Sequence, residues 1–342
     1  MKKKSIIVLL LLSFQSFCQI PDFREIDIAA KNTSVNDSKT VQQLAKSLVK
    51  NCKTDTEKVR SFYVWIATNI RYDFVGFKTG KVPEQSANST LRSKLAVCQG
   101  YSELFYSLCR LNNIDCYLVT GYSKGYGYKQ SKKFEGTDHA WNAVKIDKKW
   151  HLIDVTWGSG YVNENNQYVV YFAEEHFLSS PQSFILKHLP ADPMWQLLPE
   201  AITISTFEKD STFIKKAIAT SSQSINYADT LSYFATLDSV SKIINSSMRI
   251  IRYNPDNADA WYKMGWFYFQ NAWLNMEKLN NVAVQRNKSL ARPLAVSAIN
   301  YQNEALKYLK EAEKRDSFYD DDIRQKRQII SQNMKSLQQI IK

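Results

Sequence analysis

Apolar residues recur at helical spacing in three segments of the first third of the chain. Residues 40–50 predict a first helix, because their apolar side chains fall three or four positions apart. A second helix is predicted over residues 54–70, where Thr54 and Glu57 have the spacing of a capping box and an apolar stripe follows. A third helix is predicted to begin at Cys98 and to end before the NNI sequence that follows it.

Strand patterns follow this third helix, and two of them are joined by a short polar turn. Alternating and β-branched residues predict strands over 116–122, 140–146 and 149–157. If the turn consists of Asp147 and Lys148 alone, the two later strands pair as an antiparallel hairpin with a fixed register.

This register brings a histidine and an aspartate together. His139 and Asp154 fall on the same face of the hairpin as diagonal neighbours, within reach of each other's side chains. A slip of one residue would move Asp154 to the opposite face. His151 falls on that opposite face, and we interpret His176 and His188, further along the chain, as structural.

Beyond about residue 206 the strand patterns stop, and long helical patterns with little glycine take over. The segment NPDNADAWYKMGWFYF has Trp261, Gly265 and Tyr268 at the offsets of the first helix of a tetratricopeptide repeat, and NEALKYLKEAEKRD resembles the second helix. Extra residues separate these halves, so one degenerate repeat and a plain helical bundle both stay open. Either would form a docking surface or a brace.

The chain begins MKKKSIIVLLLLSFQSFCQ, in which three lysines precede an apolar run too short to span a membrane. This layout predicts a signal peptide over residues 1–18 and therefore a secreted or periplasmic protein. A lipid anchor on Cys18 is the rival interpretation. Gln15 and Phe17 argue against it, because lipid attachment usually has leucine and a small residue at these positions. No later segment is apolar enough to span a bilayer.

The composition favours a globular protein and does not indicate nucleic-acid binding. The chain has 342 residues, 44% of them hydrophobic and 13% aromatic, which is typical of a globular protein with room for two domains. The net charge of +12 predicts a basic surface that attracts anionic envelope polymers. Since no clustered basic face or known module accompanies the charge, nucleic-acid binding is not predicted.

Four cysteines follow the predicted signal peptide, namely Cys52, Cys98, Cys109 and Cys116. Their number is too small for a disulfide framework in a chain of this length, and no Cys-x-x-Cys spacing indicates zinc. Cys109 and Cys116 have the spacing of core positions. Whether these two are bridged stays open.

Cys98 has the position of a nucleophile. The start of a helix and a neighbouring imidazolium both stabilise a thiolate, and a free backbone N–H there can donate to an oxyanion. A histidine that takes the thiol proton and a carboxylate that orients the histidine complete such a site. His139 and Asp154 are the candidates for these two roles. The alternative is that Cys98 is only a buried apolar side chain.

Three sequence blocks resemble the transglutaminase-like superfamily, and most of all its branch related to the kyphoscoliosis peptidase and its bacterial relatives. They are VCQGYSELFYSLCRLNNIDCYLVTGYSKG, DHAWNAVKIDKKWHLIDVTWGSG and FLSSPQSFILKHLPADPMWQLL. The resemblance covers roughly residues 40–200 and implies a papain-like α+β fold, with the nucleophile helix packed on an antiparallel sheet. It implies Cys98 as nucleophile, His139 as general base and acid, and Asp154 as the orienting group, without a metal or organic cofactor.

Related proteins often have a second oxyanion donor upstream of the cysteine, and Tyr72 and Gln85 are the candidates here. Trp141, beside His139, is expected near the substrate. The loop over residues 124–137 leads to His139 and is expected to line the cleft.

The implied reaction is acyl transfer through a thioester on a carboxamide or peptide substrate. We expect hydrolysis, as a protease or deamidase, because water is the default acceptor in an open cleft; an amine acceptor would give cross-linking. The alternative is a binding module that keeps the fold without turnover. The predicted organisation is a signal peptide (1–18), an extension (19–39), a transglutaminase-like domain (40–206) and a helical domain (207–342) that offers a surface to a protein partner.

Overall fold

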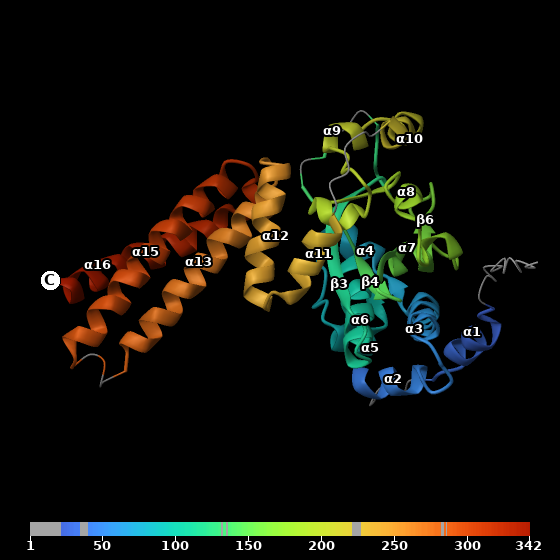
Figure 1. The fold of residues 1–342 in the computed structure, drawn as a ribbon, viewed down its shortest axis with the longest axis horizontal. Helices are drawn as coiled ribbons and strands as arrows, with labels where there is room; N and C mark the ends of the chain where they lie inside the picture. Colours follow the sequence, from blue (N-terminus) through green and yellow to red (C-terminus); the bar gives the residue numbers. More distant parts are fainter. Residues whose placement is uncertain are drawn as a thin grey trace, which may run out of the picture.

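The computed structural model describes residues 22–34, 40–130, 133–134, 136–220, 227–281, 284 and 286–342. The predicted signal peptide, with Cys18, lies outside these residues, as do parts of the predicted extension and of the loop before His139. Figure 1 shows a part that contains the strands, and a set of long helices that extends away from it toward the C-terminus.

The strand-containing part has these elements in chain order: α1 (Arg24–Lys31), α2 (Val41–Leu48), α3 (Asp55–Asn69), β1 (Arg71–Tyr72), α4 (Phe74–Thr79), α5 (Ala87–Ser93), β2 (Leu95–Ala96), α6 (Cys98–Leu111), β3 (Cys116–Ser123), β4 (His139–Ile146), β5 (Lys149–Ile153), α7 (Val155–Ser159), β6 (Gly160–Val162), β7 (Tyr168–Val170), η1 (Glu174–His176), α8 (Pro181–Phe184), β8 (His188–Pro190), η2 (Pro193–Gln196), α9 (Ile204–Phe207) and α10 (Ser211–Thr220). The helices that follow are α11 (Tyr227–Thr236), α12 (Ser239–Tyr253), α13 (Ala258–Leu279), α15 (Lys288–Glu313), η3 (Ser317–Tyr319) and α16 (Asp320–Ile341).

The central sheet has four antiparallel strands in the order β5-β4-β3-β8. The predicted hairpin register is confirmed, since Ile146 pairs with Lys149. Asp147 and Lys148 between them both have positive φ, as a two-residue turn of type I′ requires. A parallel pair, β1–β2, and an antiparallel pair, β6–β7, form two smaller sheets.

The predicted packing of the third helix on an antiparallel sheet is confirmed, and the fold is α+β. Helix α6 and helix α3 share one core cluster with the sheet. Its fully buried side chains include Phe62 and Ile66 of α3, Tyr101, Leu104, Phe105 and Leu108 of α6, and Val144 of β4. Helix α3 begins at the predicted capping box of Thr54 and Glu57. This packing fixes the start of α6, where Cys98 lies.

The strand predicted over residues 149–157 is too long. β5 ends at Ile153, and Asp154 instead becomes the N-cap of α7, accepting a hydrogen bond from the Trp157 backbone N–H at 3.1 Å. A carboxylate that can cap a helix competes with strand extension, because it satisfies a backbone donor at the helix start. The predicted diagonal contact of His139 with Asp154 is still made, from the end of the strand.

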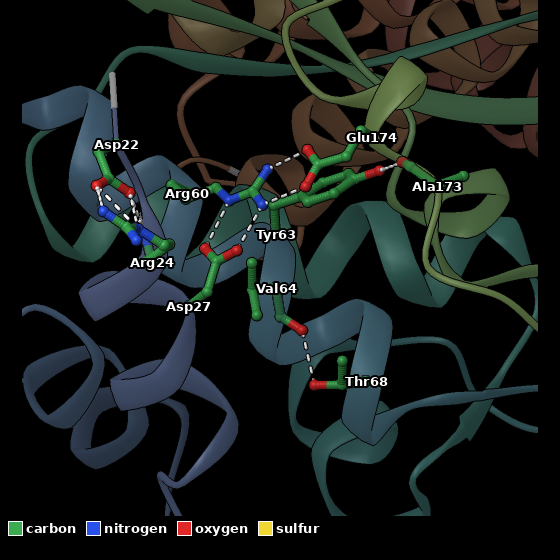
Figure 2. Close-up of polar contacts among 9 residues, drawn as sticks. All are labelled: Asp22, Arg24, Asp27, Arg60, Tyr63, Val64, Thr68, Ala173 and Glu174. Carbon is green, nitrogen blue, oxygen red and sulfur yellow. Dashed lines mark hydrogen bonds and ion pairs between the residues drawn. The ribbon is translucent and has the colours of Figure 1, made fainter. Parts of the chain in front are cut away.

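The N-terminal helix α1 is tied to the rest of the molecule by one buried arginine. Arg60 of α3 makes paired hydrogen bonds to Asp27 of α1 and to Glu174 of η1, with distances of 2.6–2.7 Å (Figure 2). Its guanidinium also lies 4.9 Å from the centre of the Phe177 ring. These contacts hold in place the segment that contains η1, which Figure 2 shows also bonded through Ala173 to the Tyr63 hydroxyl.

The long helices are joined to the sheet through α12. Arg249 of α12 forms a bidentate ion pair with buried Asp192, at 2.6 and 2.7 Å. A hydrophobic cluster runs from Tyr122 of β3 through Phe207 to Ile250 of α12. The boundary predicted at residue 206 therefore lies within a shared core, and the division into two domains stays a prediction.

Helices α13 and α15 pack on each other, and α16 packs on α15 (Figure 1). Gly265 of α13 allows the close approach, because a Cβ there would lie 2.7 Å from the Leu309 side chain. The two helices have 22 and 26 residues, longer than the paired helices of a 34-residue repeat, so the tetratricopeptide assignment stays a prediction. Within the described ranges, no helix combines the length and apolar character needed to cross a membrane.

Candidate active site

Cys98 is the first residue of α6 and is half-buried. The N-cap residue Val97 has extended backbone and makes no side-chain cap, so the start of α6 has backbone N–H groups that no capping side chain satisfies. The Gln85 side chain accepts the Val97 backbone N–H at 2.9 Å and thereby fixes the residue that precedes the cysteine. The sequence prediction of a helix that starts at Cys98 is confirmed.

His139, the first residue of β4, contacts Asp154. Its Nε2 is 2.8 Å from Oδ2 of Asp154, and both side chains are buried. The Cys98 side chain contributes to the raised pKa of this imidazole, so the sulfur lies near it. Because Nε2 is engaged with the carboxylate, Nδ1 is the ring nitrogen that is left for the thiol. The structure thus brings His139 and Asp154 into direct contact, while the role of Cys98 as their third partner stays a prediction.

The electrostatics of His139 follow from these two partners. Burial lowers the pKa of the imidazole, but the charge and hydrogen bond of Asp154 raise it, and the hydrogen bond and charge of Cys98 add to this. The net effect raises the pKa of His139 to about 10. An imidazolium is therefore the favoured form at neutral pH when the sulfur beside it is ionised.

Asp154 has a third partner that the sequence interpretation missed. His188, the first residue of β8, places Nε2 3.0 Å from Oδ2 of Asp154, the same oxygen that His139 contacts. Burial raises the pKa of the carboxyl, but the charge and hydrogen bond of His139, followed by those of His188, outweigh it and hold the pKa far below its usual range. Interpreting His188 as structural was therefore incomplete. Its only signal in the sequence is a histidine that begins a short apolar strand.

His188 is held rigidly. Its ring stacks on Phe184 with centroids 4.0 Å apart and lies 4.2 Å from the Trp157 ring. Burial lowers the pKa of His188 to about 4, despite the opposing charge of Asp154, so the ring is neutral at neutral pH. A neutral ring whose Nε2 bonds to a carboxylate carries its proton on Nε2 and donates it.

The side chains of His139, Asp154 and His188 each offer a ligand atom, and these atoms lie within 4.8 Å of one another. A group of this kind could hold a metal ion. The same atoms are also each other's hydrogen-bond donors and acceptors, which explains the arrangement without an ion.

A pocket of about 550 Å³ opens beside His139. His139, Trp157 and His176 line one side, and Tyr72 lies on its wall, whereas Cys98 is not among the lining residues. Burial raises the pKa of Tyr72 far above its usual range, and the negative charge of Cys98 is the next cause, so the phenol lies near the sulfur. Tyr72 therefore fits the predicted position in the cleft.

Two other cleft predictions need correction. Trp141 is fully buried between His139, His188 and Phe184, and it is Trp157 that reaches the pocket. Gln85 lies outside the pocket, with its amide oxygen bonded to the Val97 N–H and its amide nitrogen to the Pro83 carbonyl. The first error arises because Trp141, two residues after His139, shares its face of the sheet but lies deeper in the core, where its ring packs on Phe184 and His188.

The other cysteines lie in different surroundings. Cys109 and Cys116 are buried free thiols, and burial, together with a hydrogen bond that the Cys109 thiol donates to Cys116, raises the pKa of Cys109. Cys52 is half-buried, and its burial raises the thiol pKa to about 11. His151 is half-buried on β5, on the strand face predicted for it, opposite Val144.

The class of protein follows from this fold together with a comparison of the sequence. Residues 42–155, which span α2 to the start of α7 and contain Cys98, His139 and Asp154, match the family model of the transglutaminase-like superfamily. This part of the chain is therefore similar to the transglutaminase-like superfamily, as the sequence blocks implied.

Individual proteins are similar to parts of this chain. Human kyphoscoliosis peptidase is 35% identical over 193 residues, which are 56% of this chain and 29% of that protein. Hillarin of Drosophila melanogaster is 29% identical over 210 residues, covering 57% of this chain and 25% of its own length. A crystal structure of a TGase aligns over 48% of this chain and 40% of its own, at 21% identity and a TM-score of 0.26. The matched region thus spans less than a third of either curated relative.

Proposed function

We propose that this chain is an exported cysteine enzyme that transfers acyl groups from peptide or carboxamide substrates through a thioester on Cys98. The observation that carries the proposal is His139, whose Nε2 bonds to Asp154 and whose pKa is raised in part by the neighbouring Cys98 side chain. The name of the human relative, a peptidase, agrees with water as the usual acceptor.

In the proposed mechanism His139 takes the proton of the Cys98 thiol, and the sulfur attacks the substrate carbonyl. The backbone N–H of Cys98, at the start of α6, stabilises the oxyanion, and the Tyr72 hydroxyl is the proposed second donor. His139 then protonates the departing amine. Water attacks the thioester, passes a proton to His139, and releases the acid and the free thiol.

Asp154 and His188 have positioning roles in this proposal. Asp154 accepts from Nε2 of His139 and so keeps Nδ1 directed at the sulfur. His188 and the Trp157 backbone N–H hold the carboxylate from two further directions. A carboxylate with three donors stays ionised and in one orientation, which pre-organises the imidazole.

A non-catalytic binding module is the second candidate. The observation in its favour is that His139 lines the large pocket whereas Cys98 does not. On this view the pocket holds a peptide without turnover, and the helices from α11 onward offer a surface to a partner protein. Export, from the predicted signal peptide, and this partner surface are parts of the proposal on either view.

The test is product analysis by mass spectrometry. Wild type and Cys98→Ala are incubated with a peptide mixture, with and without an added primary amine. A gain of one water and a split chain indicate cleavage, a gain of about one mass unit indicates deamidation, and addition of the amine indicates transfer. Products from wild type and none from Cys98→Ala are expected. Identical, unchanged peptides in every arm would favour the binding module.

A further inference from the structure

The pocket lies beside only one of the two reacting groups of the proposed mechanism. His139, the group that protonates the leaving amine, lines the pocket, whereas the nucleophilic residue Cys98 does not. In acyl transfer by a cysteine, the acyl group stays on sulfur while the amine departs past the imidazole. A space that touches the imidazole but not the cysteine therefore corresponds to the amine side of the substrate.

The walls of this space combine aromatic rings with charged side chains, among them Asp138, Glu175 and Lys187. Six of its lining residues are Phe74, Phe77, Tyr126, Trp157, Tyr161 and Tyr171. Phe77 has 44% of its surface exposed and Tyr161 has 54%, so their rings are available to a ligand. Lining Lys124 is already engaged, because its ammonium group donates to the Lys209 carbonyl at 2.6 Å.

The pocket is bridged on its outer side by contacts between separate elements. Phe74 of α4 and Tyr126 of the loop after β3 meet edge to face, with centroids 5.0 Å apart. The Tyr126 hydroxyl bonds to Asn166 in the turn between β6 and β7. Such a bridge encloses an apolar group and limits the access of water to the space beside the imidazole.

The size of the pocket also matters for the kind of reaction. A volume of about 550 Å³ is in the range that holds a drug-sized ligand, far more than the ammonia that simple deamidation would release. An enzyme that only deamidated side-chain carboxamides would have no use for a large, partly aromatic space at this position.

We propose that this pocket is the amine-side subsite and that it selects amines bearing an aromatic or large aliphatic group, either as the leaving part of a peptide bond or as the acceptor. The proposal rests on the acyl-transfer function above. It favours peptide cleavage or transfer to an amine over deamidation.

When an amine is the acceptor, acyl transfer needs no reactant other than the thioester and that amine. The amine nitrogen attacks the thioester carbonyl, a C–N bond forms and the C–S bond breaks. The proton lost by the amine passes through His139 to the sulfur, which regenerates the thiol. In the reverse direction the same subsite receives the leaving amine of a peptide bond.

The first experiment measures how the acyl-enzyme partitions. Wild type is acylated with a p-nitrophenyl ester of an N-blocked amino acid, in the presence of 2-phenylethylamine or of 2-methoxyethylamine at equal free-base concentration. We expect an amide-to-acid ratio about tenfold higher for the aromatic amine, because its ring is removed from water against the aromatic walls of the pocket. Phe77→Ala and Tyr161→Ala should lower that preference at least threefold, and Tyr233→Ala, an exposed tyrosine on α11, should leave it unchanged.

The second experiment does not depend on turnover. Cys98→Ala is titrated with the 2-phenylethylamide and the methylamide of N-acetylglutamine, and tighter binding of the first by at least fivefold is expected. Equal partition and equal binding would overturn the subsite even if the enzyme is active. If Cys98→Ala binds the 2-phenylethylamide selectively but wild type is never acylated, the pocket is an aromatic-binding site and the proposed enzymatic function is wrong.

Discussion

Asp154 and His188 are 34 residues apart in the chain, and yet Nε2 of His188 lies 3.0 Å from the carboxylate oxygen that also contacts His139. The carboxylate of the site is thereby shared by two imidazoles. One of them, His139, is favoured as a cation beside an ionised sulfur, while the other is buried and neutral. The pair shows how one fold gives two histidines opposite protonation states.

Loss of the His188 donor should weaken catalysis without unfolding the protein. We expect His188→Ala to lower kcat/KM about tenfold, since Asp154 then holds His139 less firmly. His188→Gln keeps a side-chain N–H donor and should restore part of the rate. His151→Ala, on β5, is the matched control and should act like wild type. A loss of activity in His188→Ala that follows only its loss of folded protein, with the Gln variant equally impaired, would contradict the positioning role.

The two histidines predict a maximum in stability against pH. The pKa of His188 falls from 6.5 to about 4 on folding, so the unfolded state binds more protons between these values and stability is lost as the pH falls from 6.5. The pKa of His139 rises from 6.5 to about 10, so its contribution is complete below 6.5 and is lost as the pH rises toward 10. Urea unfolding from pH 4 to 10 should therefore show greatest stability near pH 6.5. His188→Gln should flatten the acidic limb, by roughly 3 kcal/mol at most.

Alkylation should separate Cys98 from the other thiols. At pH 7 iodoacetamide is expected to label Cys98 at least tenfold faster than Cys52, whose burial raises its thiol pKa to about 11. His139→Ala removes the imidazole that accepts the thiol proton, and it should slow labelling of Cys98 while Cys52 keeps its rate. Peptide mapping after timed quenching gives both rates in one sample. Equal rates at the two cysteines in wild type would argue against an activated nucleophile.

Tyr72 is expected to act in the transition state rather than in binding. Tyr72→Phe removes only the hydroxyl and should lower kcat roughly tenfold or more with little change in KM, as for loss of an oxyanion donor. Tyr171→Phe, an exposed residue of the same pocket, is the control and should leave kcat unchanged. A change in KM alone would assign Tyr72 to the pocket wall.

The buried Arg60 should matter for stability and the exposed Arg24 should not. Arg60→Gln leaves Asp27 and Glu174 without their partner, and we expect unfolding to become easier by about 2–4 kcal/mol. Arg24→Gln removes only an exposed, solvent-screened ion pair with Asp22 and should leave the unfolding midpoint unchanged (Figure 2). Denaturant unfolding of the two variants checks this difference, and equal midpoints would refute it.

The sequence by itself determined the local parts of the site. A capping box sets the start of α3, a two-residue polar turn sets the β4–β5 register, and an apolar stripe begins at Cys98. These features depend on neighbours within a few positions, where periodicity and turn chemistry act directly. The register was enough to bring His139 to Asp154.

Only the tertiary structure decided which residues surround that pair. His188 reaches Asp154 because β8 pairs with β3 across the sheet, and Trp157 rather than Trp141 reaches the pocket because α7 interrupts the predicted strand. Such neighbours come from elements far apart in the chain, whose order in the sheet no local pattern encodes. Short stretches of sequence are enough to identify the reactive groups. The second imidazole beside the carboxylate and the aromatic pocket form only when the strands and helices pack together.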